Sequence, residues 1–139
     1  MSWIVAGLLS AVFASLVAIF GKVGLKGIDT TLATSVRATV MAVFLIGFAL
    51  IFGKLRDIHL LTGRPLVFII LSGLAGAISW LFYFYALKNG PAGGVAALDR
   101  LSVVFVVVFA AMFLAEALTW KTALGTVLIT LGAILFTLK

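Results

Sequence analysis

The chain has 139 residues, of which 65% are hydrophobic and only 10% are charged, and its formal net charge is +6. A water-soluble domain of this length could not bury so much apolar surface, so the composition excludes a soluble globular protein and indicates one integral membrane domain over residues 1–139. Cysteine is absent, which excludes a disulfide framework, a thiolate nucleophile and a cysteine-ligated metal.

Five segments are apolar over the roughly 20 residues that a helix needs to cross the hydrocarbon core. They predict an all-α, polytopic membrane protein whose five transmembrane helices cover residues 2–21, 31–53, 66–87, 92–115 and 119–138. We read the first as a retained helix and not as a signal peptide, because no basic residue precedes its apolar run. The protein is therefore expected in a lipid bilayer, and in the cytoplasmic membrane if its source is prokaryotic.

The breaks between these helices carry turn signals. Residues 21–31 combine glycines, charges and a threonine that can cap a helix, and residues 53–65 form the one long polar loop. Pro91 stands where the fourth helix begins, a position that tolerates proline. An odd number of spans places the two ends of the chain on opposite sides of the membrane.

Basic residues are shared evenly between those two sides. One side carries Lys54, Arg56, Arg64 and Lys121, and the other carries Lys22, Lys26, Lys88 and Lys139. The positive-inside rule therefore gives little orientation. Either a small imbalance near the helix ends fixes one orientation, or the chain inserts both ways and two copies can pair antiparallel. No basic stripe is interleaved with aromatic residues, so nucleic acid is not an expected partner.

Small residues predict helix faces that can pack closely. The first helix carries a stripe at spacings of 4, 3, 4 and 3: Gly7, Ala11, Ala14, Ala18 and Gly21. In lipid such a stripe permits close backbone approach, which serves ordinary helix packing or a helix that lines a cavity at Ala14. Gly125 and Gly132 share one face of the last helix and predict a packing or dimerisation surface.

The third helix combines small polar residues with aromatic ones. Ser72, Gly76, Ser79 and Tyr83 share a face, and Trp80 lies beside it. This face suits the wall of a solute pocket, and Gly76 also suits helix packing. Tyr83 lies near the helix end, where an interfacial aromatic belt explains it equally well.

Three charged residues lie well inside predicted helices, away from the helix ends. Asp99 and Arg100 are about seven residues into the fourth helix, ~10 Å deep, and Arg37 reaches a similar depth from the same side in the second helix. Each costs about 2.5–3.5 kcal/mol on insertion scales, so each should face protein or water. Arg37 and Asp99 can form a structural ion pair, or all three residues can contact a solute or proton directly. Two arginines against one aspartate favour an anionic or zwitterionic solute.

Nothing in the sequence indicates an enzyme. The one histidine, His59, lies in a loop without a nucleophile and acid at a recognisable spacing. The sequence also lacks a metal-ligand cluster, a phosphate-binding loop and a dinucleotide fingerprint. We therefore expect no catalytic residue, no metal and no cofactor.

The stretch FYALKNGPAGGVAALDRLSVVFVVVFAAMFLAEALTW resembles the EamA-type domain of the drug/metabolite transporter superfamily. The matching features are Ala86-Leu87, Gly90-Pro91, the FLAE-x-LT ending of the fourth helix and the glycine-spaced last helix. Most members carry two inverted five-helix repeats, and a single repeat is similar to the bacterial and archaeal branch. The resemblance implies half of a ten-helix inverted-repeat transporter, completed as an antiparallel homodimer with its solute near the midplane.

Two features depart from that family. Relatives often carry proline in the fourth helix, where this chain reads Leu101-Ser102-Val103, so a kink there lacks its usual cause. The four-helix multidrug relatives bind cations through a glutamate in the first helix, whereas residues 11–15 of this chain are uncharged. That difference argues against the interpretation of this chain as a cationic-drug exporter.

We therefore predict a secondary, alternating-access transporter of a small polar metabolite, built from two antiparallel copies. Arg37, Asp99 and Arg100 form its charged network, and Trp80 and Ser79 line the cavity. Protons are a further candidate partner through Asp99, although a pairing with Arg37 would favour the charged carboxylate and oppose that role. The rival prediction is a non-transporting scaffold or accessory subunit, or half of a heteromeric carrier, with a sealed, ion-paired interior.

Overall fold

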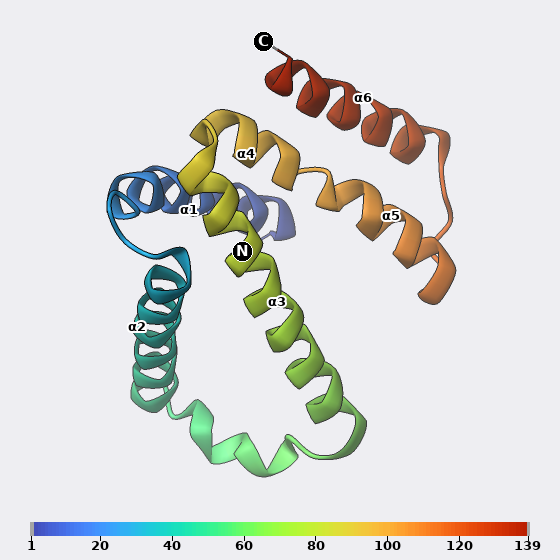
Figure 1. The fold of residues 1–139 in the computed structure, drawn as a ribbon. Coiled ribbons are helices and arrows are strands. Elements are labelled where there is room, and N and C mark those ends of the chain that lie inside the picture. Colours follow the sequence, from blue (N-terminus) through green and yellow to red (C-terminus); the bar gives the residue numbers. More distant parts are fainter. Residues whose placement is uncertain (1, 139) are drawn as a thin grey trace. The chain divides into compact units, whose positions relative to one another are not determined.

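The computed structural model describes residues 2–138, in which every regular element is helical. The elements in chain order are α1 (Trp3–Gly24), α2 (Thr30–Ile51), the 3-10 helix η1 (Lys54–Leu60), α3 (Gly63–Asn89), α4 (Ala92–Asp99), α5 (Ser102–Phe113) and α6 (Trp120–Thr137) (Figure 1). Lys139, one of the basic residues compared between the two sides of the membrane, lies outside the described residues.

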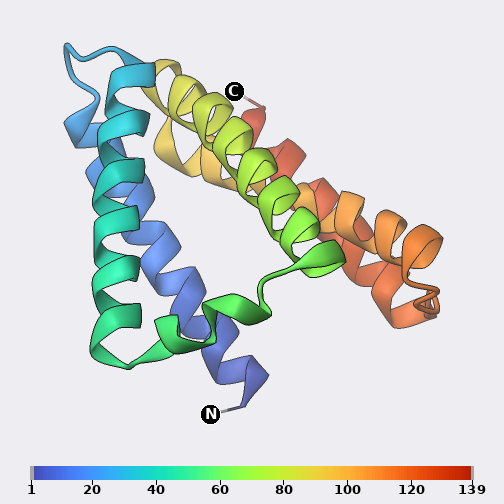
Figure 2. The ribbon, with the colours of Figure 1, turned by 90° about the horizontal axis from the view of Figure 1, so that it is seen from below.

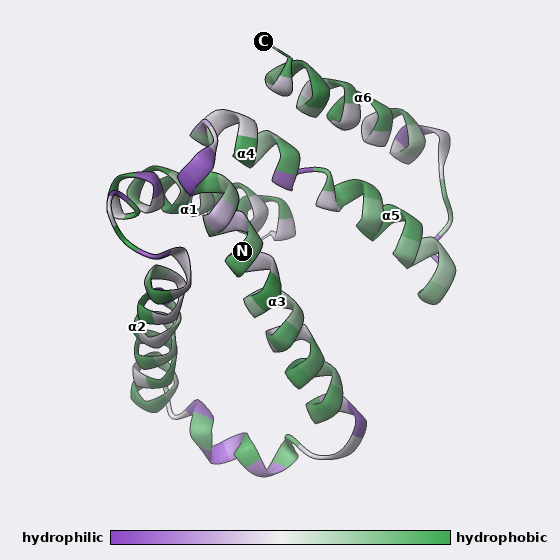
Figure 3. Ribbon diagram, in the orientation of Figure 1, coloured by the Kyte–Doolittle hydropathy of each residue, from purple (hydrophilic) through white to green (hydrophobic). Residues whose placement is uncertain are grey.

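Five spans in residues 2–138 are long and apolar enough to cross a bilayer, as the sequence predicts. They are Trp3–Gly24, Thr30–Ile51, Gly63–Asn89, Ala92–Phe113 and Trp120–Thr137. Hydrophilic colour gathers in the connecting segments and where α4 meets α5 (Figure 3). Large apolar side chains point outward along the spans; Phe82 is 72% exposed and Phe113 75%. Such a surface is stable in lipid and not in water, so the protein is an integral, multi-pass membrane protein.

The chain divides into two compact units, Met1–Lys22 with Asn89–Lys139, and Val23–Lys88. In the second unit, α2 and α3 come nearest where α2 begins and α3 ends, and they diverge toward η1 (Figure 2). Lys88 links the end of α3 to the segment just before α2, because its ammonium donates a 2.8 Å hydrogen bond to the Ile28 carbonyl. Asp29 caps α2 by accepting a 2.9 Å bond from the Leu32 N–H, so the predicted threonine cap is wrong.

The polar loop 53–65 is more ordered than a loop prediction implies, since η1 occupies Lys54–Leu60. Gly53 and Gly63 flank η1 at φ values of 65° and 64°. Glycine adopts this left-handed conformation without the Cβ strain that disfavours it in other residues, so these two residues let the chain turn out of α2 and into α3.

In the unit Met1–Lys22 with Asn89–Lys139, α4 and α5 both pack against α6. Gly94 is buried there, and a Cβ at this position would lie 3.5 Å from the Phe136 carbonyl oxygen and 3.3 Å from Cγ of Pro91. Lys22 donates a 2.8 Å hydrogen bond to the Gly90 carbonyl just before α4. The missing side chain of Gly94 therefore leaves room for the Pro91 ring, and the start of α4 lies in contact with the end of α6.

The fourth predicted helix is not continuous. The chain places α4 and α5 where one helix over 92–115 is predicted, with Arg100 and Leu101 between them. α5 then ends at Phe113, and Ala115 takes a left-handed φ of 53° while the Glu116 N–H donates to the Ala110 carbonyl at 3.3 Å. The helix therefore stops two residues early through a turn that apolar periodicity does not reveal.

Candidate functional site: two grooves, each with one arginine

A groove of about 630 Å³ lies between α2 and α3, within the unit Val23–Lys88. This volume is within the range of small-molecule pockets. Its polar end is formed by Thr34, Ser35, Arg37 and Trp80. Its apolar length is lined by Ala38, Met41, Ala42 and Leu45 from α2 and by Gly73, Gly76, Ala77 and Leu81 from α3. Arg37 is the one charged residue in this lining.

Arg37 lies on an aromatic cluster of α3. Its guanidinium carbon is 3.6 Å from the centroid of the Trp80 ring and 5.6 Å from that of Phe84. The Tyr83 ring meets Trp80 edge-on at 5.3 Å, and Phe84 is almost fully buried. Residues three and four apart share a helix face, which is why positions 80, 83 and 84 bring their rings together. A desolvated cation–π contact of this kind is worth about 2 kcal/mol, so the rings stabilise a charge inside the span.

The hydroxyls at the polar end are already committed to the backbone. Thr34 donates to the Thr30 carbonyl at 2.7 Å, and Ser35 donates to the Thr31 carbonyl at 2.9 Å. Among the residues that line this groove, the remaining side-chain N–H donors belong to Arg37 and to the indole of Trp80. The polar end of the groove is therefore built to donate hydrogen bonds to an acceptor.

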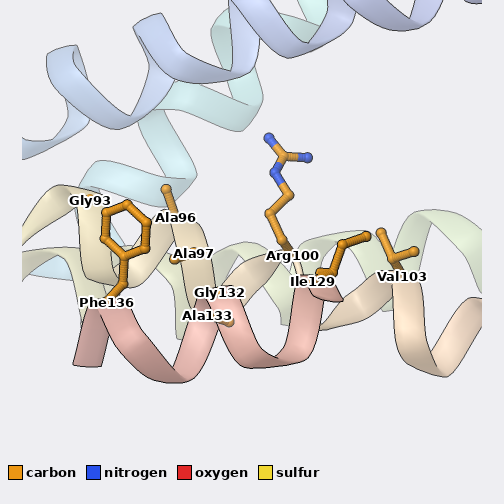
Figure 4. Close-up of a pocket in the computed structure, with 9 residues that line it drawn as sticks. All are labelled: Gly93, Ala96, Ala97, Arg100, Val103, Ile129, Gly132, Ala133 and Phe136. Carbon is orange, nitrogen blue, oxygen red and sulfur yellow. The ribbon is translucent and has the colours of Figure 1, made fainter. Parts of the chain in front are cut away.

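A second groove, of about 460 Å³, lies between α4, α5 and α6 in the other unit. Figure 4 shows its lining, in which Gly93 and Phe136 stand at one end and Arg100 extends away from α6. Arg100 is again the one charged residue of the lining. Each unit thus carries a groove whose walls are apolar and whose single charge is positive.

The break between α4 and α5 falls directly on the charged pair. Asp99 is the last residue of α4, and the following turn tightens to i→i−3 bonds, with the Leu101 N–H donating to Leu98 at 3.0 Å and the Val103 N–H donating to Arg100 at 3.1 Å. In a membrane, irregular backbone is tolerated where it packs on protein or lines a water-filled cavity. The break occurs without proline, and the expectation that this part of the fourth span faces protein or water stays a prediction.

The structure brings some of the predicted site residues together and leaves others apart. Arg37 and Trp80 meet in the α2–α3 groove, and Tyr83 supports Trp80 from the side. Ser72 and Ser79 are exposed and do not line that groove, so their role in a solute path stays a prediction. Arg37 and Asp99 belong to different units, and their ion pair also stays a prediction.

The predicted packing residues divide in a similar way. Ala18 is buried, while Ala14 and Gly21 are half-buried and Ala11 is exposed. A Cβ added at Gly7, Gly76, Gly125 or Gly132 would meet nothing within 4 Å. The close approach that the structure does contain involves Gly94, which the sequence reading missed although the run GPAGG contains it. The reading also missed Phe84, whose i+4 spacing from Trp80 could have revealed it.

Comparison with known proteins gives the family. Residues 1–138 match the EamA-like transporter family. The chain belongs to that family. This EamA chain is also 42% identical over 134 residues to an "Uncharacterized transporter in cobO 3'region" from a Sinorhizobium species, an alignment that covers 96% of this chain and 95% of the relative. No solved structure matches it.

A second relative extends the comparison to an archaeon. "Uncharacterized protein MJ1333.1" of Methanocaldococcus jannaschii is 29% identical over 136 residues, which cover 98% of this chain and 96% of the relative. Both relatives are therefore about as long as this chain. Family membership and the name of the first relative support a membrane transporter and favour a protein that is not an enzyme.

Proposed function

We propose that this EamA chain is half of a secondary transporter for a small anionic or zwitterionic metabolite. The observation that carries the proposal is the charge of the two grooves, because arginine is the one charged residue in each lining. A groove of this kind attracts a carboxylate or phosphate and repels a cation, since an uncompensated charge in an apolar site is strongly unfavourable.

We further propose that two copies in opposite orientations form the carrier. Five spans place the ends of each chain on opposite sides, and the basic residues near the helix ends give little bias to either orientation. Two such copies would be related as inverted repeats, which bind solute near the midplane. The relatives of matching length support a protein that works with one five-helix unit per chain.

Alternating access would then use the two copies of the charged network. Arg37, Asp99 and Arg100 of one copy would lie on the opposite side of the midplane from those of the other. The break at Arg100–Leu101 gives each copy a point at which α4 can change its angle to α5, since fewer i→i−4 bonds hold it there. Opening one network while the other closes would expose the solute to one side at a time.

The test is solute counterflow into proteoliposomes. A panel of carboxylates, amino acids and alkylamines is tested, and vesicles loaded with one unlabelled solute should accumulate the same radiolabelled solute if it is transported. We expect this accumulation for a carboxylate or an amino acid and not for alkylamines. Arg37→Gln should reduce counterflow at least tenfold, and Arg37→Lys should retain part of it, because lysine keeps the charge but not the planar stacking. Arg56→Gln in η1, outside both grooves, is the matched control and should leave counterflow unchanged.

Counterflow of alkylamines with no counterflow of anions would contradict the proposed solute class. Full activity of Arg37→Gln would remove Arg37 from the solute path. Absence of counterflow for the entire panel would favour the non-transporting scaffold or accessory subunit.

A further inference from the structure

We infer that the α2–α3 groove binds an anionic amphiphile, with the anionic head at Arg37 and Trp80 and the apolar body along the groove toward Leu45. The inference deepens the proposed function and rests on it, in that it gives the transported anion an apolar body. It differs from the general prediction of a small polar solute, because it requires a molecule with two chemically distinct ends.

The head of the ligand follows from the donors at the polar end. Arg37 is half-buried with its guanidinium face on the Trp80 ring, which leaves the edge of the guanidinium to donate hydrogen bonds. The hydroxyls of Thr34 and Ser35 are spent on backbone carbonyls and so cannot donate to an anion. A planar carboxylate fits this set best, because guanidinium binds carboxylates in a bidentate geometry.

The body of the ligand follows from the rest of the lining. Beyond Arg37 the α2 wall is Ala38, Met41, Ala42 and Leu45, all apolar, and it continues for eight residues or about 12 Å of helix. The α3 wall opposite is kept low by Gly73 and Gly76, where a Cβ would meet nothing within 4 Å. A compact polar anion would leave this length of groove unfilled, whereas an alkyl or aryl body would cover it.

The competing ligand classes fit less well. A cation would have to enter beside Arg37, which the aromatic cluster already holds in place. A zwitterion would bring an ammonium group for which the groove lining offers no carboxylate. A neutral apolar molecule would leave the Arg37 donors without an acceptor.

The experiment is a binding titration that reports on Trp80 alone. Trp3→Phe and Trp120→Phe remove the other two tryptophans, which are 84% and 78% exposed and lie outside both grooves. The protein is placed in phosphatidylcholine nanodiscs and titrated with butanoate, octanoate, dodecanoate, 1-octanol and octylammonium, while Trp80 fluorescence is recorded. We expect a saturable change with octanoate that is at least tenfold tighter than with butanoate and is absent with octylammonium.

Two variants separate the head from the body. Arg37→Gln should weaken octanoate at least tenfold, and Arg56→Gln, the control, should not. Gly76→Leu adds an apolar side chain to the groove and keeps the arginine, and it should weaken octanoate while leaving butanoate unchanged. If Arg37→Gln does not fold, Gly76→Leu still decides the question. Equal responses to octanoate and octylammonium, or octanoate binding that survives both variants, would overturn the inference.

The same chemistry can come from the bilayer or from a free solute. Nanodiscs that contain phosphatidylglycerol distinguish the two sources. If the groove takes an anionic membrane lipid, that lipid should compete with octanoate and weaken its binding. If the groove takes a free solute, octanoate should bind as it does in phosphatidylcholine alone. Failure of the proposed function remains separable. Octanoate binding without counterflow of any solute would support the amphiphile site and contradict the transporter function. Counterflow that does not depend on chain length would support the transporter function and contradict the amphiphile site.

Discussion

The guanidinium carbon of Arg37 lies 3.6 Å from the ring centroid of Trp80, and this contact joins α2 to α3 inside the span. An arginine at this depth needs protein or water around it, and here an indole face supplies part of that need. The same two residues line the α2–α3 groove and carry its remaining side-chain N–H donors. One interaction therefore stabilises the fold and sets the charge of the site.

Trp80 should contribute to stability chiefly through its ring face. Trp80→Ala removes the cation–π contact and should lower the free energy of unfolding by about 1–2 kcal/mol, whereas Trp80→Phe keeps a ring and should lower it less. Reversible unfolding in mixed detergent micelles measures both. Trp120→Ala is the control, because Trp120 is 78% exposed. Equal effects of Trp80→Ala and Trp80→Phe would show that the ring face does not stabilise Arg37.

Gly94 should be intolerant of a side chain. A Cβ there would be tight against Cγ of Pro91 at 3.3 Å and in ordinary contact with the Phe136 carbonyl oxygen at 3.5 Å, so the added methyl groups of Gly94→Val should crowd Pro91 and the end of α6. We expect a loss of about 1–3 kcal/mol in the same unfolding measurement. Gly47→Val is the matched control, since a Cβ at Gly47 meets nothing within 4 Å. An unchanged stability of Gly94→Val would mean that α4 and α6 do not approach as described.

The protein should be more stable with glycine at position 115 than with alanine. The φ of 53° at Ala115 is unfavourable for any residue with a Cβ, while glycine adopts it freely. After the entropy that glycine adds to the unfolded state, we expect Ala115→Gly to gain about 0.5–1 kcal/mol. Ala111→Gly, inside α5, should change stability in the opposite direction. A loss of stability in Ala115→Gly would contradict the left-handed end of α5.

The predicted ion pair between Arg37 and Asp99 can be tested by a double-mutant cycle. The single changes Arg37→Met and Asp99→Asn each remove one charge, and the double change removes both. If the pair forms, the unfolding free energies should show a coupling of about 1 kcal/mol or more. Additive effects would assign Arg37 to Trp80 alone and leave Asp99 available to solute or protons.

The number and placement of the spans could be predicted from sequence, because a lipid solvent demands about 20 apolar residues for each helix. Arg37 and Trp80 could likewise be singled out, since a charge and a large aromatic residue in mid-span each require an explanation. Their contact could not be predicted. It depends on the rotation and tilt of α2 against α3, which apolar periodicity does not encode.

The break between α4 and α5 escaped prediction for a different reason. Sequence reasoning finds helix breaks through proline and glycine, and residues 99–102 contain neither. The interruption consists of a shift from i→i−4 to i→i−3 bonding around Leu101, which any residue can adopt. Ala115 likewise carries a left-handed turn without the glycine that usually marks one.

Two copies of this chain in opposite orientations are proposed to make one carrier, and labelling of the two termini distinguishes that arrangement from a single orientation. The chain has no cysteine, so Ser2→Cys and Leu138→Cys each introduce a single reactive thiol. Intact cells are treated with a membrane-impermeant maleimide, and the remaining thiols are counted after permeabilisation. If the two orientations coexist, each terminus is labelled in comparable amounts from both sides. If one terminus is labelled only from outside and the other only after permeabilisation, the chain has a single orientation and the antiparallel homodimer is wrong.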